Sequence, residues 1–148
     1  MTDLEAMQAA LTEARLAAEA GEVPIGAVVL RDGTIVARAQ NRVLRDLDPT
    51  AHAEMVALRA AAAAVGNYRL NGCALYVTLE PCAMCAGAMI HARLDRLVFA
   101  ALDPKAGAAG SVLEVLNHPQ LNHRMVVEQG ILAEESAELL RGFFRERR

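Results

Sequence analysis

Four side chains that can bind a metal ion or move a proton lie in two short segments of this 148-residue chain. His52 and Glu54 form the first segment, and Cys82 and Cys85, in a Cys-x-x-Cys arrangement, form the second. Imidazole and thiolate are ligands that zinc prefers, and a catalytic zinc ion has three protein ligands and one open position. His52, Cys82 and Cys85 therefore predict a catalytic zinc site, provided that the fold brings the two segments together.

The two cysteines alone leave other chemistry open. At the first turn of a helix, where we expect them, the helix dipole lowers the pKa of a thiol and suits a redox-active pair as well as a metal site. The upstream His52 favours the metal. A structural zinc would need a fourth protein ligand, and the candidates are Cys73, His91 and His123. We expect Cys73 instead to be a small buried apolar residue and His91 to lie at a helix end.

Glu54 has the chemistry of a general acid and base. A carboxylate beside a zinc-bound water can take its proton, pass it to the substrate and later protonate the leaving group. Residues two apart in a regular helix lie about 200° apart around the axis, so a regular helix would separate His52 from Glu54. We therefore expect His52 at an irregular first turn, with the longer side chain of Glu54 bending back towards the metal.

The rest of the chain must position these segments. Apolar residues at helical spacing predict a first helix from about Leu4 to Ala18, which ends at Gly21. Residues 25–30 and 34–39 flank an Asp-Gly step and predict two antiparallel strands joined by a hairpin. The remaining predicted elements are a helix from an N-cap at Thr50 to about Val65, a strand over 74–79, a helix over 82–92, strands over 97–100 and 125–128, and a closing helix over 133–147.

This order of elements predicts a single α/β domain over residues 1–148, with a mixed five-stranded sheet between two layers of helices. If the helices that carry His52 and the two cysteines follow adjacent strands, both begin at the same edge of the sheet. The connection from Leu102 to Arg124 is long for a compact domain. Its apolar residues between Val112 and Leu116 predict one short helix inside it.

Composition excludes several classes of protein. A hydrophobic content of 54% predicts a sizeable core rather than a disordered chain. A net charge of -3 argues against indiscriminate binding of nucleic acid. The sequence lacks an apolar run of roughly 20 residues and a recognisable secretory signal, so we expect a cytoplasmic protein without a membrane span. Three cysteines in a reducing compartment argue against a framework of disulfide bonds.

The basic residues are unevenly distributed. Of the 15 Lys and Arg residues, Arg141, Arg145, Arg147 and Arg148 lie within the last eight positions. A solvated, charged helix is the ordinary interpretation of such a segment. The alternative is an electrostatic footprint for an RNA backbone, with Phe144 as an aromatic side chain able to pack on a base.

The two metal-binding segments, Thr50–Glu54 and Thr78–His91, resemble the signature blocks of the bacterial tRNA-specific adenosine deaminases, within the cytidine deaminase superfamily. The pattern His-x-Glu followed by Pro-Cys-x-x-Cys is a known signature of zinc deaminases, and this sequence matches it. These blocks alone would also fit cytidine, cytosine or guanine deaminases. The loop Gly107–Ser111 and the Phe143-Phe144 segment narrow the resemblance, which covers nearly the whole chain.

The resemblance implies a cytidine deaminase-like fold, one zinc ion per subunit and hydrolytic conversion of adenosine to inosine at wobble position 34 of a tRNA anticodon. It implies that Glu54 moves protons, that Asn41 holds the target nucleotide, and that the backbone amide of Ala83 orients the base or the zinc-bound water. The candidate contacts to the anticodon loop are Asp103, Lys105 and Phe144. The family acts as a homodimer in which each tRNA loop touches both subunits. Leu102 departs from the family, where some members carry a basic residue.

Two other functions remain open at this point. One is deamination of a free base such as guanine or cytosine, for which we expect the C-terminal segment to close the pocket. The other is a non-catalytic, zinc-stabilised RNA-binding module, for which we expect a fourth protein ligand at the metal.

Overall fold

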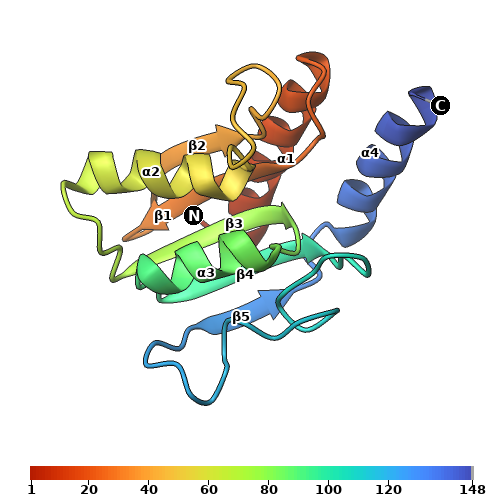
Figure 1. The fold of residues 1–148 in the computed structure, drawn as a ribbon. Coiled ribbons are helices and arrows are strands. Elements are labelled where there is room, and N and C mark those ends of the chain that lie inside the picture. The colour runs from red at the N-terminus through yellow and green to blue at the C-terminus, as the bar shows by residue number, and fades with distance from the viewer. Residues whose placement is uncertain (148) are drawn as a thin grey trace.

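The computed structural model describes residues 1–147. Its helices and strands follow the predicted order, with small shifts at their ends (Figure 1). In chain order they are α1 (Asp3–Glu19), β1 (Gly26–Arg31), β2 (Thr34–Gln40), α2 (Ala53–Val65), β3 (Cys73–Leu79), α3 (Ala83–His91), β4 (Arg96–Ala101), β5 (Val126–Gln129) and α4 (Ala133–Glu146). None of the helices in residues 1–147 is both long enough and apolar enough to cross a bilayer.

The strands form one mixed sheet in the order β2-β1-β3-β4-β5. Strand β1 pairs antiparallel with both β2 and β3, whereas β3, β4 and β5 run parallel. Helices α2 and α3 cover one face of the sheet, and α1 and α4 lie on the other (Figure 1). The predicted three-layer α/β/α arrangement with a five-stranded sheet is confirmed.

The core lies on both faces of the sheet, because successive residues of a strand point to opposite sides. In β1, Ala27 and Val29 belong to the larger cluster under α2 and α3, whereas Val28 packs with α1. Helix α1 approaches the sheet so closely that only glycine fits at position 26. A Cβ at Gly26 would lie 2.0 Å from the carbonyl oxygen of Ala10.

The hairpin between β1 and β2 has the predicted turn. Asp32 and Gly33 both have positive φ angles, 52° and 75°, as a type I′ turn requires. This turn reverses the chain so that β2 runs antiparallel to β1, as β3 does on the other side.

One expectation about the sheet was wrong in detail. The strands that precede α2 and α3 are β2 and β3, and they are not adjacent, because β1 lies between them. Since both are antiparallel to β1, they run in the same direction and end at the same edge. The two helix starts therefore still meet at one edge of the sheet.

The predicted short helix between Val112 and Leu116 is absent from the structure, which shows turns and an isolated bridge between Ala109 and Glu114. The backbone N–H groups here have other acceptors. Those of Val112 and Leu113 donate to the carbonyl oxygen of Gly107.

A hydrogen-bonded ion cluster ties α1 to three strands. Arg96 on β4 donates to both carboxylate oxygens of Asp3, at 2.6 and 2.8 Å, and to both oxygens of Glu128 on β5, at 2.8 and 3.0 Å. The hydroxyl of Tyr76 on β3 donates to Asp3 at 2.6 Å. Hydrogen bonds from Arg96 and Tyr76 lower the pKa of Asp3 to about 2.

This cluster predicts a pH-dependent contribution to stability. An unfolded Asp has a pKa of about 3.9, so the carboxylate of Asp3 stabilises the fold above pH 4, and this contribution is lost as the pH falls towards 2. We expect Asp3→Asn to lower the free energy of unfolding by about 1 kcal/mol at pH 7, because the pair is partly exposed. Urea unfolding of both proteins between pH 7 and pH 3 measures the difference.

Glu19→Gln is the matched control, because Glu19 is an exposed acid of the same helix that forms no ion pair within residues 1–147. Its stability should follow that of the wild type. A stability difference for Asp3→Asn that is unchanged between pH 7 and pH 3 would contradict the assignment.

Candidate functional site

His52, Cys82 and Cys85 converge at the edge where β2 and β3 end. The sulfurs of Cys82 and Cys85 each lie 3.6 Å from Nδ1 of His52, and the three candidate ligand atoms all lie within 4.8 Å of one another. Tetrahedral zinc, with Zn–N bonds of about 2.0–2.1 Å and Zn–S bonds of about 2.3 Å, requires N···S distances of about 3.6 Å. The donor set thus fits zinc in both chemistry and spacing.

The local backbone explains how each ligand reaches the group. His52 is the N-cap of α2, with extended φ and ψ angles of -65° and 152°. The predicted position of His52 outside the regular helix is confirmed, and the predicted N-cap at Thr50 was wrong. Cys82 is the N-cap of α3, also in extended conformation, and Cys85 lies buried in the first turn.

Asn41 supplies the cap that His52 does not. Oδ1 of Asn41 accepts a hydrogen bond from the backbone N–H of Ala53 at 2.7 Å, so it satisfies one of the free donors at the start of α2. Since Oδ1 is committed to Ala53, the remaining functional group of this buried amide is its Nδ2 donor. Asn41 therefore lies directly beside the helix start that carries His52 and Glu54.

The sulfur and imidazole groups affect each other's protonation. Hydrogen bonds from Cys85 and His52 lower the pKa of Cys82 to about 3, which favours a thiolate. The thiol of Cys85 donates to that thiolate, which raises the pKa of Cys85. The hydrogen bond between His52 and Cys82 raises the pKa of His52. The site therefore holds one thiolate ready to bind a cation even before a metal contributes its own charge.

Glu54 is enclosed at the same site. Glu54 is only 4% exposed, and burial raises the pKa of its carboxyl group to about 7. The carboxylate of Glu54 does not belong to the group of three mutually close ligand atoms. Glu54 is therefore beside the metal-binding group without completing it.

The candidates for a fourth protein ligand lie elsewhere. Cys73 begins β3, whereas Cys82 follows the other end of that strand. His91 is exposed at the end of α3, and Nε2 of His123 lies 2.6 Å from the carbonyl oxygen of Leu94. Among residues 1–147, the metal-binding group consists of His52 and the two cysteines after β3 alone, so the structure does not support the four-ligand module.

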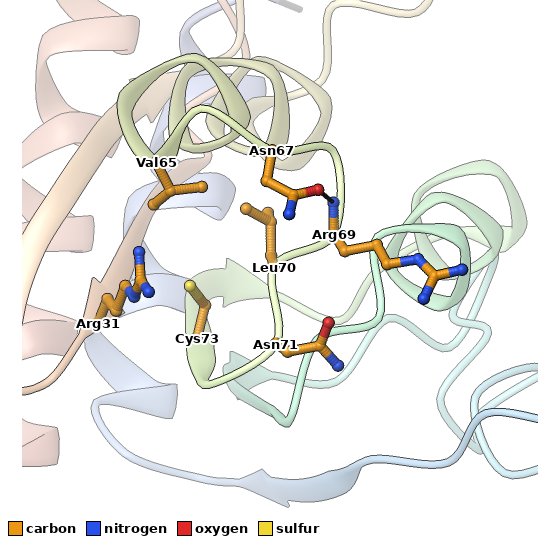
Figure 2. A pocket seen from close by; sticks show the side chains of 7 residues that line it. All are labelled: Arg31, Val65, Asn67, Arg69, Leu70, Asn71 and Cys73. Carbon is orange, nitrogen blue, oxygen red and sulfur yellow. Dashed lines mark hydrogen bonds between the residues drawn. The ribbon is translucent and has the colours of Figure 1, made fainter.

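Cys73 lines a separate cavity of about 180 Å³ at the opposite edge of the sheet (Figure 2). Arg31 also lines it, but the side chains of Arg69 and Asn71 point away from its centre in Figure 2. Arg69 instead donates from Nε to the hydroxyl of Tyr68 at 3.0 Å, with its guanidinium 5.6 Å from the ring centre. The polar groups of this cavity do not converge on a common point.

The three candidate tRNA contacts in the C-terminal half line one groove. Asp103, Lys105 and Phe144 are brought together in a groove of about 1020 Å³ between α4 and the connection after β4. Leu79 and Leu102 contribute apolar surface to it. Asn41 and Ala83 are not among its lining residues, and Ala83 is exposed at the first position of α3.

The basic end of α4 is largely neutralised by its own helix. Arg141 pairs with Glu134 and Glu138, both at 2.8 Å, and Arg145 pairs with Glu138 at 3.2 Å. The guanidinium of Arg147 stacks on the ring of Phe143, 3.5 Å from its centre. Arg148 lies outside the described residues. In the described part of the chain, Lys105 forms no ion pair, which leaves its charge available in the groove.

Sequence reasoning missed two buried carboxylates that order the loops beside the metal group. Glu22, 1% exposed, accepts hydrogen bonds from the backbone of Leu44 and from the backbone and side chain of Arg45. Glu80, 2% exposed, accepts four hydrogen bonds from the segment 103–111. A signal was available for Glu80, because an acidic residue stands between an apolar strand and the Pro-Cys pair.

Comparisons with known proteins agree with this geometry. The sequence model of the MafB19-like deaminase family matches residues 1–148. The tRNA-specific adenosine deaminase of Agrobacterium fabrum is 51% identical over 142 residues, which cover 96% of this chain and 93% of that protein.

Two solved structures are also similar. One, from work on A-to-I editing by tRNA:A34 deaminases at the wobble position of transfer RNA, is 48% identical, with a TM-score of 0.89 over 92% of this chain and 99% of that one. A guanine deaminase from Nitrosomonas europaea is 26% identical, with a TM-score of 0.84 over 96% and 84% of the two chains. The chain therefore belongs to the MafB19-like deaminase family and, within it, to the tRNA-specific adenosine deaminases.

Proposed function

We propose that this enzyme hydrolyses adenosine to inosine at wobble position 34 of a tRNA anticodon. The observation that carries the proposal is the convergence of His52, Cys82 and Cys85 beside the buried carboxylate of Glu54. The similarity to tRNA-specific adenosine deaminases at about half identity over nearly the full chain supports the substrate.

One zinc ion per subunit fits the donor set. Nδ1 of His52 and the sulfurs of Cys82 and Cys85 would hold it, which is the three-ligand pattern of catalytic sites. Zinc bound there would supply a Lewis acid that lowers the pKa of water and makes it a nucleophile near neutral pH.

Glu54 would move the protons of the reaction. Its carboxylate accepts a proton from the water that attacks C6 of adenine and delivers it to the ring nitrogen N1. It then transfers a second proton from the added oxygen to the amino group at C6, which leaves as ammonia. The burial of Glu54 keeps bulk water from competing for these protons.

Asn41 and Ala83 would orient the nucleotide. The Nδ2 group of Asn41 can donate to the target nucleotide, because the hydrogen bond to Ala53 fixes the orientation of its amide. The backbone amide of Ala83, in the first turn of α3, points to the same edge of the sheet and can orient the base or the attacking water.

The groove beside α4 would bind the anticodon loop. Lys105 provides a positive charge for the phosphates, and Phe144 is 48% exposed and can pack on a base. Asp103 shapes the turn that carries Lys105, because its carboxylate accepts a hydrogen bond from the backbone N–H of Lys105. Family membership supports a homodimer in which both subunits contact the tRNA. A tRNA substrate also supports a cytoplasmic location.

Deamination of a free base is the second candidate, favoured by the likeness to the Nitrosomonas europaea guanine deaminase. A free base needs a closed pocket. In this chain the C-terminal helix leaves a groove of about 1020 Å³, which suits a larger substrate.

A direct comparison of substrates separates the two functions. An anticodon stem-loop with adenosine at position 34 should yield inosine and ammonia, whereas free adenine, guanine and cytosine should not. Nucleoside analysis of the RNA and an ammonia assay provide the readouts. Turnover of guanine without turnover of the stem-loop would refute the proposal.

The metal site predicts the zinc content of purified protein. We expect about one zinc ion per chain for the wild type, and loss of most of that zinc in Cys85→Ser. The melting temperature should fall on treatment with a chelator, since zinc binds the folded state. Cys73→Ala is the matched control, because Cys73 is buried at the other end of β3 and should leave the zinc content unchanged. Equal zinc loss in both variants would count against the assigned ligands.

Glu54→Gln separates proton transfer from metal binding. This variant should keep its zinc and lose roughly 10²- to 10⁴-fold in turnover of the stem-loop, because an amide cannot carry the protons. Glu135→Gln, an exposed acid on α4, should retain wild-type turnover. Near-normal turnover in Glu54→Gln would show that another group moves the protons.

A further inference from the structure

We propose that Glu80 is a positioning residue that holds the substrate-facing connection 102–111 in register with the metal group, and so determines affinity for the anticodon loop. This inference rests on the proposed tRNA substrate. It concerns a side chain that belongs neither to the candidate metal ligands nor to the lining of the groove.

Glu80 lies between the two parts that it would connect. It follows the last residue of β3 and comes two residues before Cys82. Its own N–H donates to the carbonyl oxygen of Ala101, at the end of β4, at 2.8 Å. The carbonyl oxygen of the next residue, Pro81, accepts from Ala108 at 2.8 Å. The strand that leads to Cys82 and the connection that carries Lys105 are thus bonded directly to each other.

The carboxylate of Glu80 organises that connection from within. Oε1 accepts from the N–H of Asp103 at 3.0 Å and from the hydroxyl of Ser111. Oε2 accepts from the N–H groups of Ala109 and Ser111, at 3.0 and 3.1 Å. All four of these contacts come from donors, so both oxygens of Glu80 act as acceptors. Glu80 therefore joins both ends of the connection as a charged acceptor.

Two features show that the connection is shaped around this carboxylate. A Cβ at Gly107 would lie 2.3 to 2.4 Å from the carboxylate atoms of Glu80, so the backbone approaches as closely as a glycine allows. Asp103, held by Glu80 through its N–H, in turn accepts at Oδ1 from the N–H groups of Lys105 and Ala106, at 3.0 and 3.2 Å. One carboxylate thereby sets the turn that presents Lys105 to the groove.

No helix or strand in the described residues fixes the conformation of this connection, so its hydrogen bonds do, and four of them end on the carboxylate of Glu80. Without the charged acceptor, the N–H groups of Asp103, Ala109 and Ser111 lose their partners, and the connection samples other conformations. The groups at the metal are unchanged. The loss should therefore appear in substrate binding more than in the chemical step.

Glu80→Gln tests this, because the amide has nearly the same volume but faces donors with an N–H group of its own. We expect the KM for the anticodon stem-loop to rise about tenfold or more, from the loss of charge-assisted hydrogen bonds, with a smaller change in kcat and full zinc content. Gly107→Ala, whose Cβ would displace the carboxylate, should raise KM similarly. The double variant should then show less than the product of the two single effects, because both disturb one interaction.

Ser111→Ala is the milder variant, since it removes the hydroxyl donor but keeps the backbone one, and should raise KM by a smaller factor. Glu128→Gln is the matched control, because the carboxylate of Glu128, on β5, accepts hydrogen bonds from Arg96 on β4, and this substitution should leave KM unchanged. An unchanged KM in both Glu80→Gln and Ser111→Ala would overturn the proposal. This holds even if Glu80→Gln lowers the melting temperature, because a loss of stability alone does not show a role in substrate binding.

Hydrogen exchange distinguishes failure of this inference from failure of the proposed function. Mass spectrometry should show faster amide exchange across residues 103–111 in Glu80→Gln than in the wild type and in Glu128→Gln. If the wild type does not act on the stem-loop, the proposed function fails while the exchange result still reports on Glu80. Wild-type activity with unchanged exchange and unchanged KM overturns only the role of Glu80.

Discussion

The site depends on the direction of two strands. Because β2 and β3 are both antiparallel to β1, the chain leaves each of them at the same edge of the sheet. At that edge His52 and Cys82 each have an extended backbone directly before a helix begins, so both are N-cap residues. A reversal of either strand would place the imidazole and the thiolates at opposite ends of the sheet. The separation of 30 positions between these two ligands matters less than this shared direction.

The local patterns predicted most of the fold, for physical reasons that can be named. The Asp32-Gly33 step predicted its hairpin because few other dipeptides accept positive φ at both positions. The position of His52 outside the regular helix followed from the rotation per residue. What failed was decided by residues distant in the sequence. Thr50 is a plausible cap by type, but Asn41, 12 residues before Ala53, provides the hydrogen bond instead.

The expected helix at Val112–Leu116 failed for a related reason. Its apolar pattern is helical, yet the turn at Gly107 supplies the acceptor for two N–H groups of the segment, and Glu80 supplies those for Ala109 and Ser111. A pattern within one segment cannot reveal an acceptor that comes from another. For the same reason the metal ligands were predictable by type, whereas the hydrogen-bond partners of the buried Glu22 and Glu80, which lie in other segments, became visible only in the fold.

The ion cluster at Arg96 has a consequence at the far edge of the sheet. Strand β5 is an edge strand, with Val126 and Gln129 exposed, and such an edge can pair with a strand from another chain. The strand is only four residues long, and Glu128 places a charge on it that Arg96 holds in a fixed position. A strand from another chain that paired with β5 would have to bury that carboxylate or break its hydrogen bonds. The same side chains that tie α1 to the sheet therefore also discourage aggregation through β5.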